Sequence, residues 1–273
     1  MESNITTFSV VHPDAQIAEN VTISPFVVIE QDVTIGEGTW IGPHVTIMSG
    51  ARIGKNCRIF PGAVIGAIPQ DLKYRGEYAT VEIGDNVTIR EYCTLNKGTA
   101  ASDRTIIGNN SLLMAYVHVA HDCLVGKNVV LANNVNLAGH IEVGDYAILG
   151  GLTGVHQFVK IGPHVMIASG VLVRKDVPPF VKGARDPLSY AGVNTVGLKR
   201  RGFTSEQINH IQEIYRILFV RGYNITKSLE IIESTIAETP ERNLILDFVR
   251  NADRGLMRGF RQINGVKAHG NIS

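Results

Sequence analysis

The chain has 273 residues, enough for one large domain or two modest ones, and 44% hydrophobic against 19% charged residues predicts a buried core. A net charge of +1 gives no indication of a nucleic-acid partner or a membrane surface. The three cysteines show no CxxC spacing, which favours a reducing compartment over a zinc ribbon or a disulfide scaffold. No signal peptide is visible, and no run of about 18 apolar residues occurs. We therefore expect a cytoplasmic protein without stable membrane insertion.

A repeat of six residues dominates the first two thirds of the chain. Steps of six from Val11 to Val173 meet Ile, Leu or Val at every position except Asp71, Glu77 and Ala101. Neither the helical period of about 3.6 nor the strand period of about 2 produces this pattern. A hexapeptide period is typical of a parallel β-helix, in which each unit supplies one short strand and one corner. Glycine and asparagine, which tolerate positive φ at corners, often follow the aliphatic residue.

Two segments interrupt the repeat without changing its phase. They lie near residues 66–80 and 96–106, and both are polar with glycine and charged residues. Because three hexapeptides complete one triangular coil, Ile65, Ile83 and Ala101 are expected to share a face with Val119, and both segments to leave from that side. Long loops on a regular scaffold more often carry function than stability.

Histidines gather on the same expected face. The hexapeptides that begin at residues 119, 137 and 155 stack in successive coils, about 4.8 Å apart, and contain His121, His140 and His156. His118 closes the preceding hexapeptide. A single histidine at such a corner is often only a solvated residue, but four beside two loops favour a functional cluster. The stretch VHVAHDCLVG (117–126) could hold a catalytic base, metal ligands or only polar surface residues of a structural repeat.

The repeat ends after residue 173, and helical patterns follow. Thr204 and Gln207 form a capping-box pattern before a helix that we expect to run through Arg216 to about Arg221. A second helix is expected over ITKSLEIIESTIAE, and a third after Thr239-Pro240. The tail RQINGVKAHGNIS lacks periodicity and is expected to be loosely ordered. We thus predict a β-helix over 1–190 and a small helical domain over 191–273.

Several motifs in this order resemble those of UDP-N-acetylglucosamine 3-O-acyltransferases. These motifs are PQDLKY, HVAHD, LAGH, VHQF, DVPP and GVN followed by GLKRRGF, within a match over roughly residues 5–258. The resemblance implies an all-β left-handed parallel β-helix with a small C-terminal α-helical domain. It also implies a cytoplasmic homotrimer that moves an R-3-hydroxyacyl chain from acyl carrier protein to the glucosamine 3-hydroxyl of UDP-N-acetylglucosamine, the first step of lipid A biosynthesis. No cofactor or metal is implied beyond the phosphopantetheine that carries the acyl chain.

The resemblance also assigns roles at the reacting centre. An unactivated alcohol is a weak nucleophile, so His121 is expected to act as general base with Asp122 holding its tautomer. The backbone N–H of Gly139 is expected to stabilise the oxyanion, with direct attack and no acyl-enzyme. Cys123 is a possible rival nucleophile, but its place in the hexapeptide suggests core packing.

Further residues are implied to bind the substrates or the carrier. The substrate-binding set is Gln70, Asp71, Leu72, Lys73, His118, His140, His156, Gln157, Asn194 and Arg200. Arg216 and Arg221 are expected to steer the acidic carrier protein. Two positions depart from the family pattern: Val196 replaces a frequent glutamate on the nucleotide side, and Ser169 replaces a glycine of some members. The resemblance therefore does not imply a nucleotide contact at Val196. It also does not imply the length of the acyl chain, which Ser169 could affect.

Other functions remain open from the sequence. A coenzyme A-dependent hexapeptide acetyltransferase or a γ-class carbonic anhydrase would share the prism, and the latter would bind zinc through histidines. The related N-acyltransferase would need a uridine-binding domain before its repeats, and the register here already starts at Val11. A β-helix without catalytic activity would leave both loops unexplained.

Overall fold

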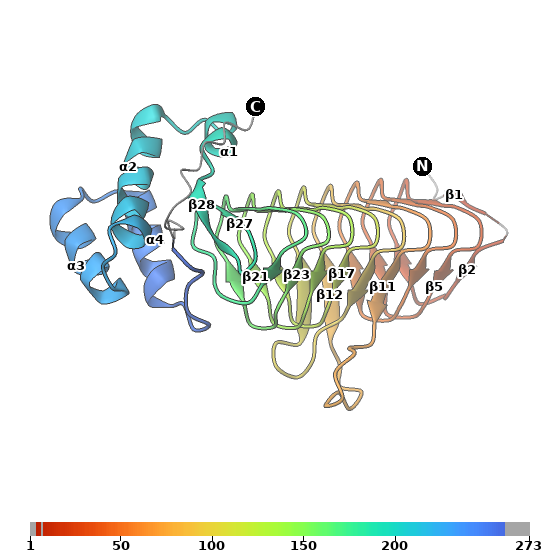
Figure 1. The fold of residues 1–273 in the computed structure, drawn as a ribbon. Coiled ribbons are helices and arrows are strands. Elements are labelled where there is room, and N and C mark those ends of the chain that lie inside the picture. The colour runs from red at the N-terminus through yellow and green to blue at the C-terminus, as the bar shows by residue number, and fades with distance from the viewer. Residues whose placement is uncertain (1–3, 7, 260–273) are drawn as a thin grey trace.

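A computed structural model describes residues 4–6 and 8–259. The chain forms a left-handed parallel β-helix followed by helices at one end, which confirms the expected fold class. Figure 1 shows the coils stacked along one axis, with the helices beyond the last coil. Most strands are two residues long and end on the aliphatic residue of the hexapeptide, as in β7 (Trp40–Ile41), where Ile41 is fully buried. The core of the prism is this inward-facing set of Ile, Leu and Val side chains.

Three sheets form the three faces of the prism. Sheet A comprises β1 (Asn4–Ile5), β4 (Thr22–Ile23), β7, β10 (Arg58–Ile59), β13 (Thr88–Ile89), β16 (Leu112–Leu113), β19 (Val130–Leu131), β22 (Ile148–Leu149), β25 (Met166–Ile167), β27 (Val181–Ala184) and β28 (Ser189–Val193). Sheet B comprises β2 (Val10–Val11), β5 (Val28–Ile29), β8 (Thr46–Ile47), β11 (Val64–Ala67), β14 (Thr94–Asn96), β17 (His118–Val119), β20 (Asn136–Leu137), β23 (Gly154–Val155) and β26 (Leu172–Val173). Sheet C comprises β3 (Gln16–Ile17), β6 (Thr34–Ile35), β9 (Ala51–Ile53), β12 (Thr80–Ile83), β15 (Arg104–Ile107), β18 (Leu124–Val125), β21 (Glu142–Val143) and β24 (Lys160–Ile161).

The two loops correct one detail of the expected stacking. Ile65 and Val119 both lie in sheet B, but Ile83 lies in sheet C. The reason is that residues between β11 and β12 leave the prism without contributing strands, so the chain resumes on the next face rather than the same one. Both loops do emerge at the corner where sheet B turns into sheet C, which is also the corner between β17 and β18. In Figure 1 they project from the same side of the prism.

Tight corners hold many side chains in the left-handed backbone region. Asn128 and Asn134 have φ of 57° and 60°, as expected for asparagine. Asp122 and His140 take the same conformation, with φ of 59° and 61°. Aspartate and histidine, like asparagine, are enriched in this region, and positive φ recurs at corners along the prism, so this conformation belongs to the fold itself.

Helices extend the chain beyond the last coil. They are α1 (Thr195–Arg200), α2 (Ser205–Tyr215), α3 (Ile225–Thr235) and α4 (Pro240–Arg250), with a π-helix, η1 (Arg216–Val220), directly after α2. The capping box of Thr204 and Gln207 is confirmed at α2, and Thr239 caps α4 with Pro240 in its first turn. Of the described helices, none is long and apolar enough to cross a membrane.

The structure adds elements that we did not expect here. The single long helix predicted after Thr204 changes to π-helical geometry at Arg216, next to Tyr215, whose fully buried hydroxyl donates to Pro179 O at 2.5 Å. The short helix α1 was not expected, nor was the antiparallel pairing of β27 with β28. The domain boundary expected at residue 190 falls inside β28 and stays a prediction. Residues 261–273, expected to be loosely ordered, lie outside the described range.

Candidate active site

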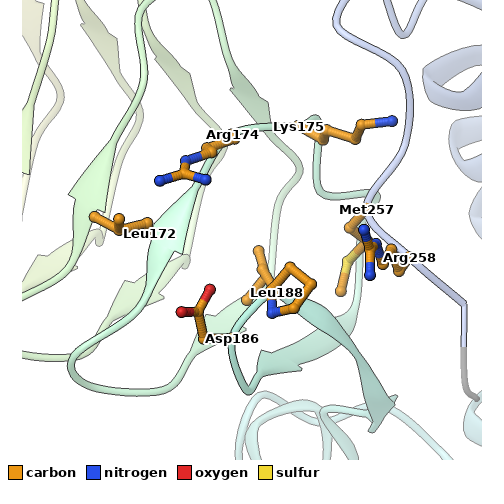
Figure 2. Close-up of a pocket in the computed structure, with 8 residues that line it drawn as sticks. Leu172, Arg174, Lys175, Asp186, Leu188, Met257 and Arg258 are labelled. Atoms are coloured by element: carbon orange, nitrogen blue, oxygen red, sulfur yellow. The ribbon is translucent and has the colours of Figure 1, made fainter.

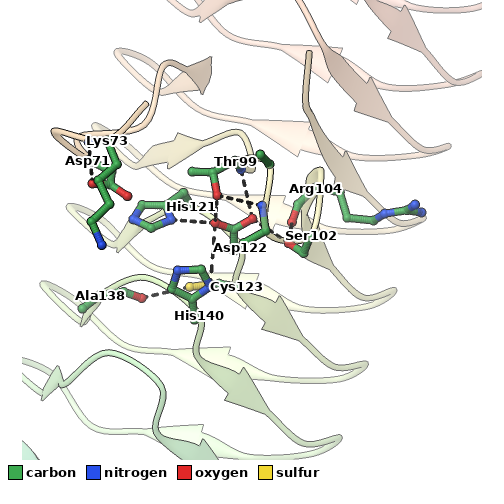
Figure 3. Close-up of polar contacts among 12 residues, drawn as sticks. Asp71, Lys73, Thr99, Ser102, Arg104, His121, Asp122, Cys123, Ala138 and His140 are labelled. Atoms are coloured by element: carbon green, nitrogen blue, oxygen red, sulfur yellow. Dashed lines mark hydrogen bonds and ion pairs between the residues drawn. The ribbon is translucent and has the colours of Figure 1, made fainter. Parts of the chain in front are cut away.

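Asp122 is the centre of a hydrogen-bond network at the corner between β17 and β18. Its Oδ1 accepts from the Thr99 backbone N–H at 2.9 Å and from Ser102 Oγ at 2.6 Å. Its Oδ2 accepts from Thr99 Oγ1 and from His121 Nδ1, each at 2.7 Å. Figure 3 shows Thr99 and Ser102, from the loop between β14 and β15, and His121, from the corner itself, around this carboxylate. Two loop residues thus fix the carboxylate that orients the histidine.

This network keeps Asp122 ionised. The side chain is 1% exposed, and burial alone would raise the pKa of its carboxyl group. The hydrogen bonds from Ser102, Thr99 and His121 outweigh that effect and lower the pKa to about 2. A permanent negative charge therefore faces the imidazole of His121, where it favours the tautomer with the proton on Nδ1 and leaves Nε2 free to accept a proton.

Gly139 lies one coil beyond His121 and against its ring. A Cβ at Gly139 would sit 2.5 Å from His121 Cε1 and 2.7 Å from Nε2. A side chain at this position would therefore displace the His121 ring. Among the described residues, the Gly139 N–H has no hydrogen-bond acceptor. A free backbone donor thus lies close to the basic nitrogen of His121.

His140 completes the centre from the next coil. Its ring meets that of His121 edge-on, with centroids 5.0 Å apart, and stacks on Phe158 at 4.5 Å. Burial lowers the pKa of His140, and the positive charge that His121 can carry acts in the same direction, while the Asp122 and Asp71 carboxylates oppose them. The ring is therefore biased toward its neutral form.

His118 and His156 line a groove over sheet B. This groove is lined by His118, Asn136, Leu137, Ala138, Gly154, Val155, His156, Leu172, Val173 and Arg174. His118 Nδ1 is 2.7 Å from Thr94 Oγ1, and burial, with a smaller effect of His121, lowers the pKa of His118. His121 and His140 contact each other at the corner, His118 is near enough to His121 for that charge to act on it, and His156 lines the groove with His118. Gln157, next to His156, is exposed.

The loop between β11 and β12 brings its motif to the same corner. Figure 3 shows Asp71 and Lys73 beside His121. Asp71 Oδ1 accepts from the Lys73 backbone N–H at 2.9 Å, and its charge reaches His140. Gln70 is exposed, and Leu72 is 95% exposed.

Asn194 precedes α1 as its N-cap residue, and Arg200 is the last residue of that helix. The Asn194 side chain accepts from Gly197 N at 3.2 Å and donates to His164 O at 2.9 Å, so it caps α1 and is almost fully buried. A substrate contact by that amide would have to replace the cap. Arg200 is exposed in the last turn of α1. Their nucleotide-binding roles stay predictions.

Arg216 and Arg221 share one carboxylate. Arg216 Nη1 lies 2.7 Å from Glu213 Oε2, and Arg221 Nη2 lies 2.6 Å from Glu213 Oε1. The positive charge of this surface is thereby reduced compared with the sequence-based expectation.

Sequence reasoning missed three residues near the site. Thr99 and Ser102 lie in the short polar loop between β14 and β15. The only signal in the sequence was that this loop interrupts the repeat on the side where the histidines were expected. Arg254, whose guanidinium lies 3.2 Å from His156 Nδ1, follows the last helix and had no local signal.

Among residues 4–6 and 8–259, one group could hold a metal ion. Ligand atoms of His121, Asp122 and His140 all lie within 4.8 Å of one another. The Asp122 oxygens, however, already accept four hydrogen bonds between them. A cation would have to displace some of these donors.

Comparison with known proteins now decides the family. The model for UDP N-acetylglucosamine O-acyltransferase domain 2 matches residues 176–257, and that for bacterial transferase hexapeptides matches residues 32–67 and 104–139. The acyl-[acyl-carrier-protein]–UDP-N-acetylglucosamine O-acyltransferase of Paracidovorax citrulli is 50% identical over 94% of this chain and 100% of its own length. The chain belongs to the UDP-N-acetylglucosamine O-acyltransferase family.

Solved structures of UDP-N-acetylglucosamine acyltransferases agree with this assignment. The enzyme from Bacteroides fragilis is 48% identical with a TM-score of 0.92, covering 93% of this chain and 100% of its own. The enzyme from Arabidopsis is 32% identical with a TM-score of 0.81, covering 94% of this chain and 100% of its own. The chain is therefore an acyltransferase of this family, and a purely structural β-helix is excluded.

Proposed function

We propose that this acyltransferase moves an R-3-hydroxyacyl chain from acyl carrier protein to the glucosamine 3-hydroxyl of UDP-N-acetylglucosamine, the first step of lipid A biosynthesis. The names of its relatives supply the two substrates. The observation that carries the mechanism is the Asp122–His121 pair, with 2.7 Å between Oδ2 and Nδ1. This pair prepares Nε2 to receive the proton of the attacking hydroxyl.

The reaction then proceeds by direct attack. As His121 takes the proton, the sugar oxygen attacks the thioester carbonyl, and the Gly139 N–H donates to the oxygen that becomes negative. Collapse of this intermediate breaks the C–S bond, and the proton held by His121 passes to the departing thiolate of phosphopantetheine. His140, biased toward its neutral form, remains available as a hydrogen-bonding group for the substrate.

Cys123 does not take part as a nucleophile in this proposal. Its side chain is buried, its thiol lies 3.0 Å from Ala138 O, and burial raises its pKa to about 12. A thiolate is the reactive form of cysteine, so a thiol with this pKa is inert at neutral pH. We propose that no cofactor and no metal is required, because the Asp122 carboxylate is fully engaged by donors. Metal analysis of active protein tests this point.

We further propose a homotrimer with sites between subunits. An exposed apolar row follows the corner between sheets A and B, where Tyr92 and Tyr116 stack with ring centroids 5.3 Å apart and are each 55% exposed. Phe26 and Leu152 lie at the same corner in other coils, separated from the tyrosine pair by His44 and Gly62 on one side and by Asn134 on the other. Large exposed apolar patches indicate interaction sites, and the exposed loop at Leu72 fits a second copy of the chain. Sedimentation should give about three times the 29.7 kDa chain mass. An active monomer would contradict shared sites.

The carrier protein needs a basic surface near the acyl groove. Arg216 and Arg221 remain our proposed docking residues, although both pair with Glu213. A second candidate surface lies at the end of the sheet B groove, in the pocket of Figure 2, whose charged lining residues are Arg174, Lys175, Arg258 and one carboxylate, Asp186. Charge reversal at Arg216 or Arg221 is expected to raise the KM for the acyl carrier at low salt, with little change for the sugar nucleotide. If only reversal at Arg174 or Arg258 does so, the carrier docks at the pocket instead.

The direct test is incubation of the purified protein with UDP-N-acetylglucosamine and a series of R-3-hydroxyacyl carrier proteins, with mass detection of the product. Acylated sugar nucleotide supports the proposal. Absence of product with every chain length would overturn it. We place the reaction in the cytoplasm, where the three free, buried cysteines would stay reduced.

A further inference from the structure

The segment after the last helix, residues 251–258, returns to the β-helix and is held there by several contacts. Lys160 Nζ lies 2.8 Å from Asp253 Oδ2. Asp176 is fully buried, and its carboxylate accepts from the backbone N–H of Lys160 at 2.8 Å and of Arg254 at 3.1 Å. The Asp176 backbone also bonds to Gly255 O and to Met257 N, each at 2.9 Å. The position of Arg254 relative to the prism is therefore fixed by its backbone.

The Arg254 side chain extends from this segment to His156. Its Nη2 lies 3.2 Å from His156 Nδ1, and both side chains are exposed. A guanidinium group has five N–H donors and no acceptor. A hydrogen bond between the two therefore requires a bare Nδ1 on the histidine. In the neutral imidazole the proton must then lie on Nε2.

A competing partner would impose the opposite tautomer. The carbonyl oxygen of Gln157 also lies 3.2 Å from His156 Nδ1, and it can only accept a hydrogen bond. If His156 donated to it, the proton would lie on Nδ1 and Nε2 would be an acceptor. One nitrogen cannot satisfy both neighbours in the neutral ring, so the two contacts require opposite tautomers.

We propose that Arg254 is a positioning residue that fixes His156 as the Nε2-protonated tautomer. Because His156 lines the sheet B groove, the ring then offers the groove an N–H donor. A donor suits a carbonyl or hydroxyl oxygen of the acyl substrate, whereas an acceptor at Nε2 would not bind a carbonyl. This inference rests on the proposed function for the identity of that substrate, but not for the tautomer itself.

The tautomer can be measured without substrate. Protein labelled with ¹⁵N-histidine, in alkaline buffer where the rings are neutral, is compared with His156→Ala to assign the His156 signals. We expect Nδ1 of the parent to resonate as an unprotonated nitrogen and Nε2 as a protonated one. Arg254→Met should shift His156 toward the other tautomer. A parent protein with the proton on Nδ1 overturns the proposal, whether or not the enzyme proves to be active.

Kinetics test the consequence through a double-mutant cycle. Arg254→Met is expected to lower kcat/KM for the acyl carrier about tenfold, and Arg254→Lys to restore part of the loss. In a His156→Ala background the same Arg254→Met change should have no further effect, since the group it positions is gone. Arg250→Met is the matched control, because Arg250 is an exposed residue four positions earlier that pairs with Glu233 and Asp247. Equal losses from Arg254→Met with and without His156 would assign it a role independent of His156 and contradict the proposal.

Discussion

His121 Nδ1 and Asp122 Oδ2 lie 2.7 Å apart, although the two residues are neighbours in sequence and Asp122 has a φ of 59°. Adjacent side chains in a regular strand point to opposite faces, so this contact depends on the corner conformation. The loop residues Thr99 and Ser102 hold the carboxylate from its other side. Orientation of the base is thus provided by the corner and by one loop together.

Replacement of Asp122 by asparagine tests that orientation. An amide can direct only one oxygen at the donors that now surround the carboxylate, and it cannot stabilise a protonated His121. We expect kcat to fall by about 10²–10⁴, the range for loss of an effective general base. Steady-state rates at saturating substrates measure this. Asp103→Asn, an exposed change in the same loop that alters the ion pair with Arg104, is the control. Equal kcat for both variants would contradict the role of Asp122.

Gly139 allows a test by steric displacement. In Gly139→Ala the new methyl group would lie 2.5 Å from His121 Cε1, so the ring must move away from the reacting atoms. We expect a loss of about 10²–10³ in kcat, comparable to loss of one oxyanion donor, with a smaller effect on KM. Thermal unfolding should show that the variant is folded. Parental kcat in a folded variant would mean that the ring and the N–H are not used as proposed.

The repeat made most of this fold predictable, because a register of aliphatic residues every six positions is incompatible with other architectures. It also placed His121 beside both loops. The repeat could not show which face carries Ile83. The loop before it leaves the prism between two faces, so the chain resumes on the next face although the six-residue spacing is kept. The contacts of Thr99 and Ser102 with Asp122 were not visible either, because they join a loop to a corner of the next coil, 23 and 20 residues away in sequence.

The helical end was less predictable for a different reason. The capping residues Thr204 and Thr239 are local signals, and both helix starts were predicted from them. The change to π-helical geometry at Arg216 occurs beside Tyr215, whose buried hydroxyl contact with Pro179 is tertiary. Arg254 reaches His156 only because buried Asp176 holds its backbone, and nothing in the nearby sequence encodes that contact.

Cys123→Ala separates direct attack from an acyl-enzyme. The thiol is buried, with its pKa raised to about 12 by burial, so the variant should keep kcat within about threefold. Loss of packing and of the contact with Ala138 O should cost roughly 1 kcal/mol in the free energy of unfolding. Intact-mass measurement after mixing parent enzyme with acyl donor should show the unmodified chain. An acyl adduct that disappears in Cys123→Ala would refute direct attack.

His164 should make stability depend on pH. Its ring stacks between Tyr146 and Phe180, and burial, with the nearby Arg201 charge, lowers its pKa from 6.5 to about 4. Between these values the unfolded state binds a proton that the folded state does not, so stability falls as pH falls from 6.5 toward 4. His164→Phe keeps the stack and removes the proton site. Chemical denaturation across this pH range should show that the free energy of unfolding decreases less with falling pH in the variant than in the parent. Parallel curves would show that His164 does not cause the loss.

The central claim is that His121 is the general base, and the most direct measurement is the rate of acyl transfer by purified His121→Ala with both substrates saturating. The account predicts a kcat lower by about 10²–10⁴ with the oligomeric state of the parent retained. His12→Ala, a change at an exposed histidine near the N-terminus, should leave the rate unchanged. A His121→Ala protein of the same oligomeric state with nearly parental kcat would contradict the account.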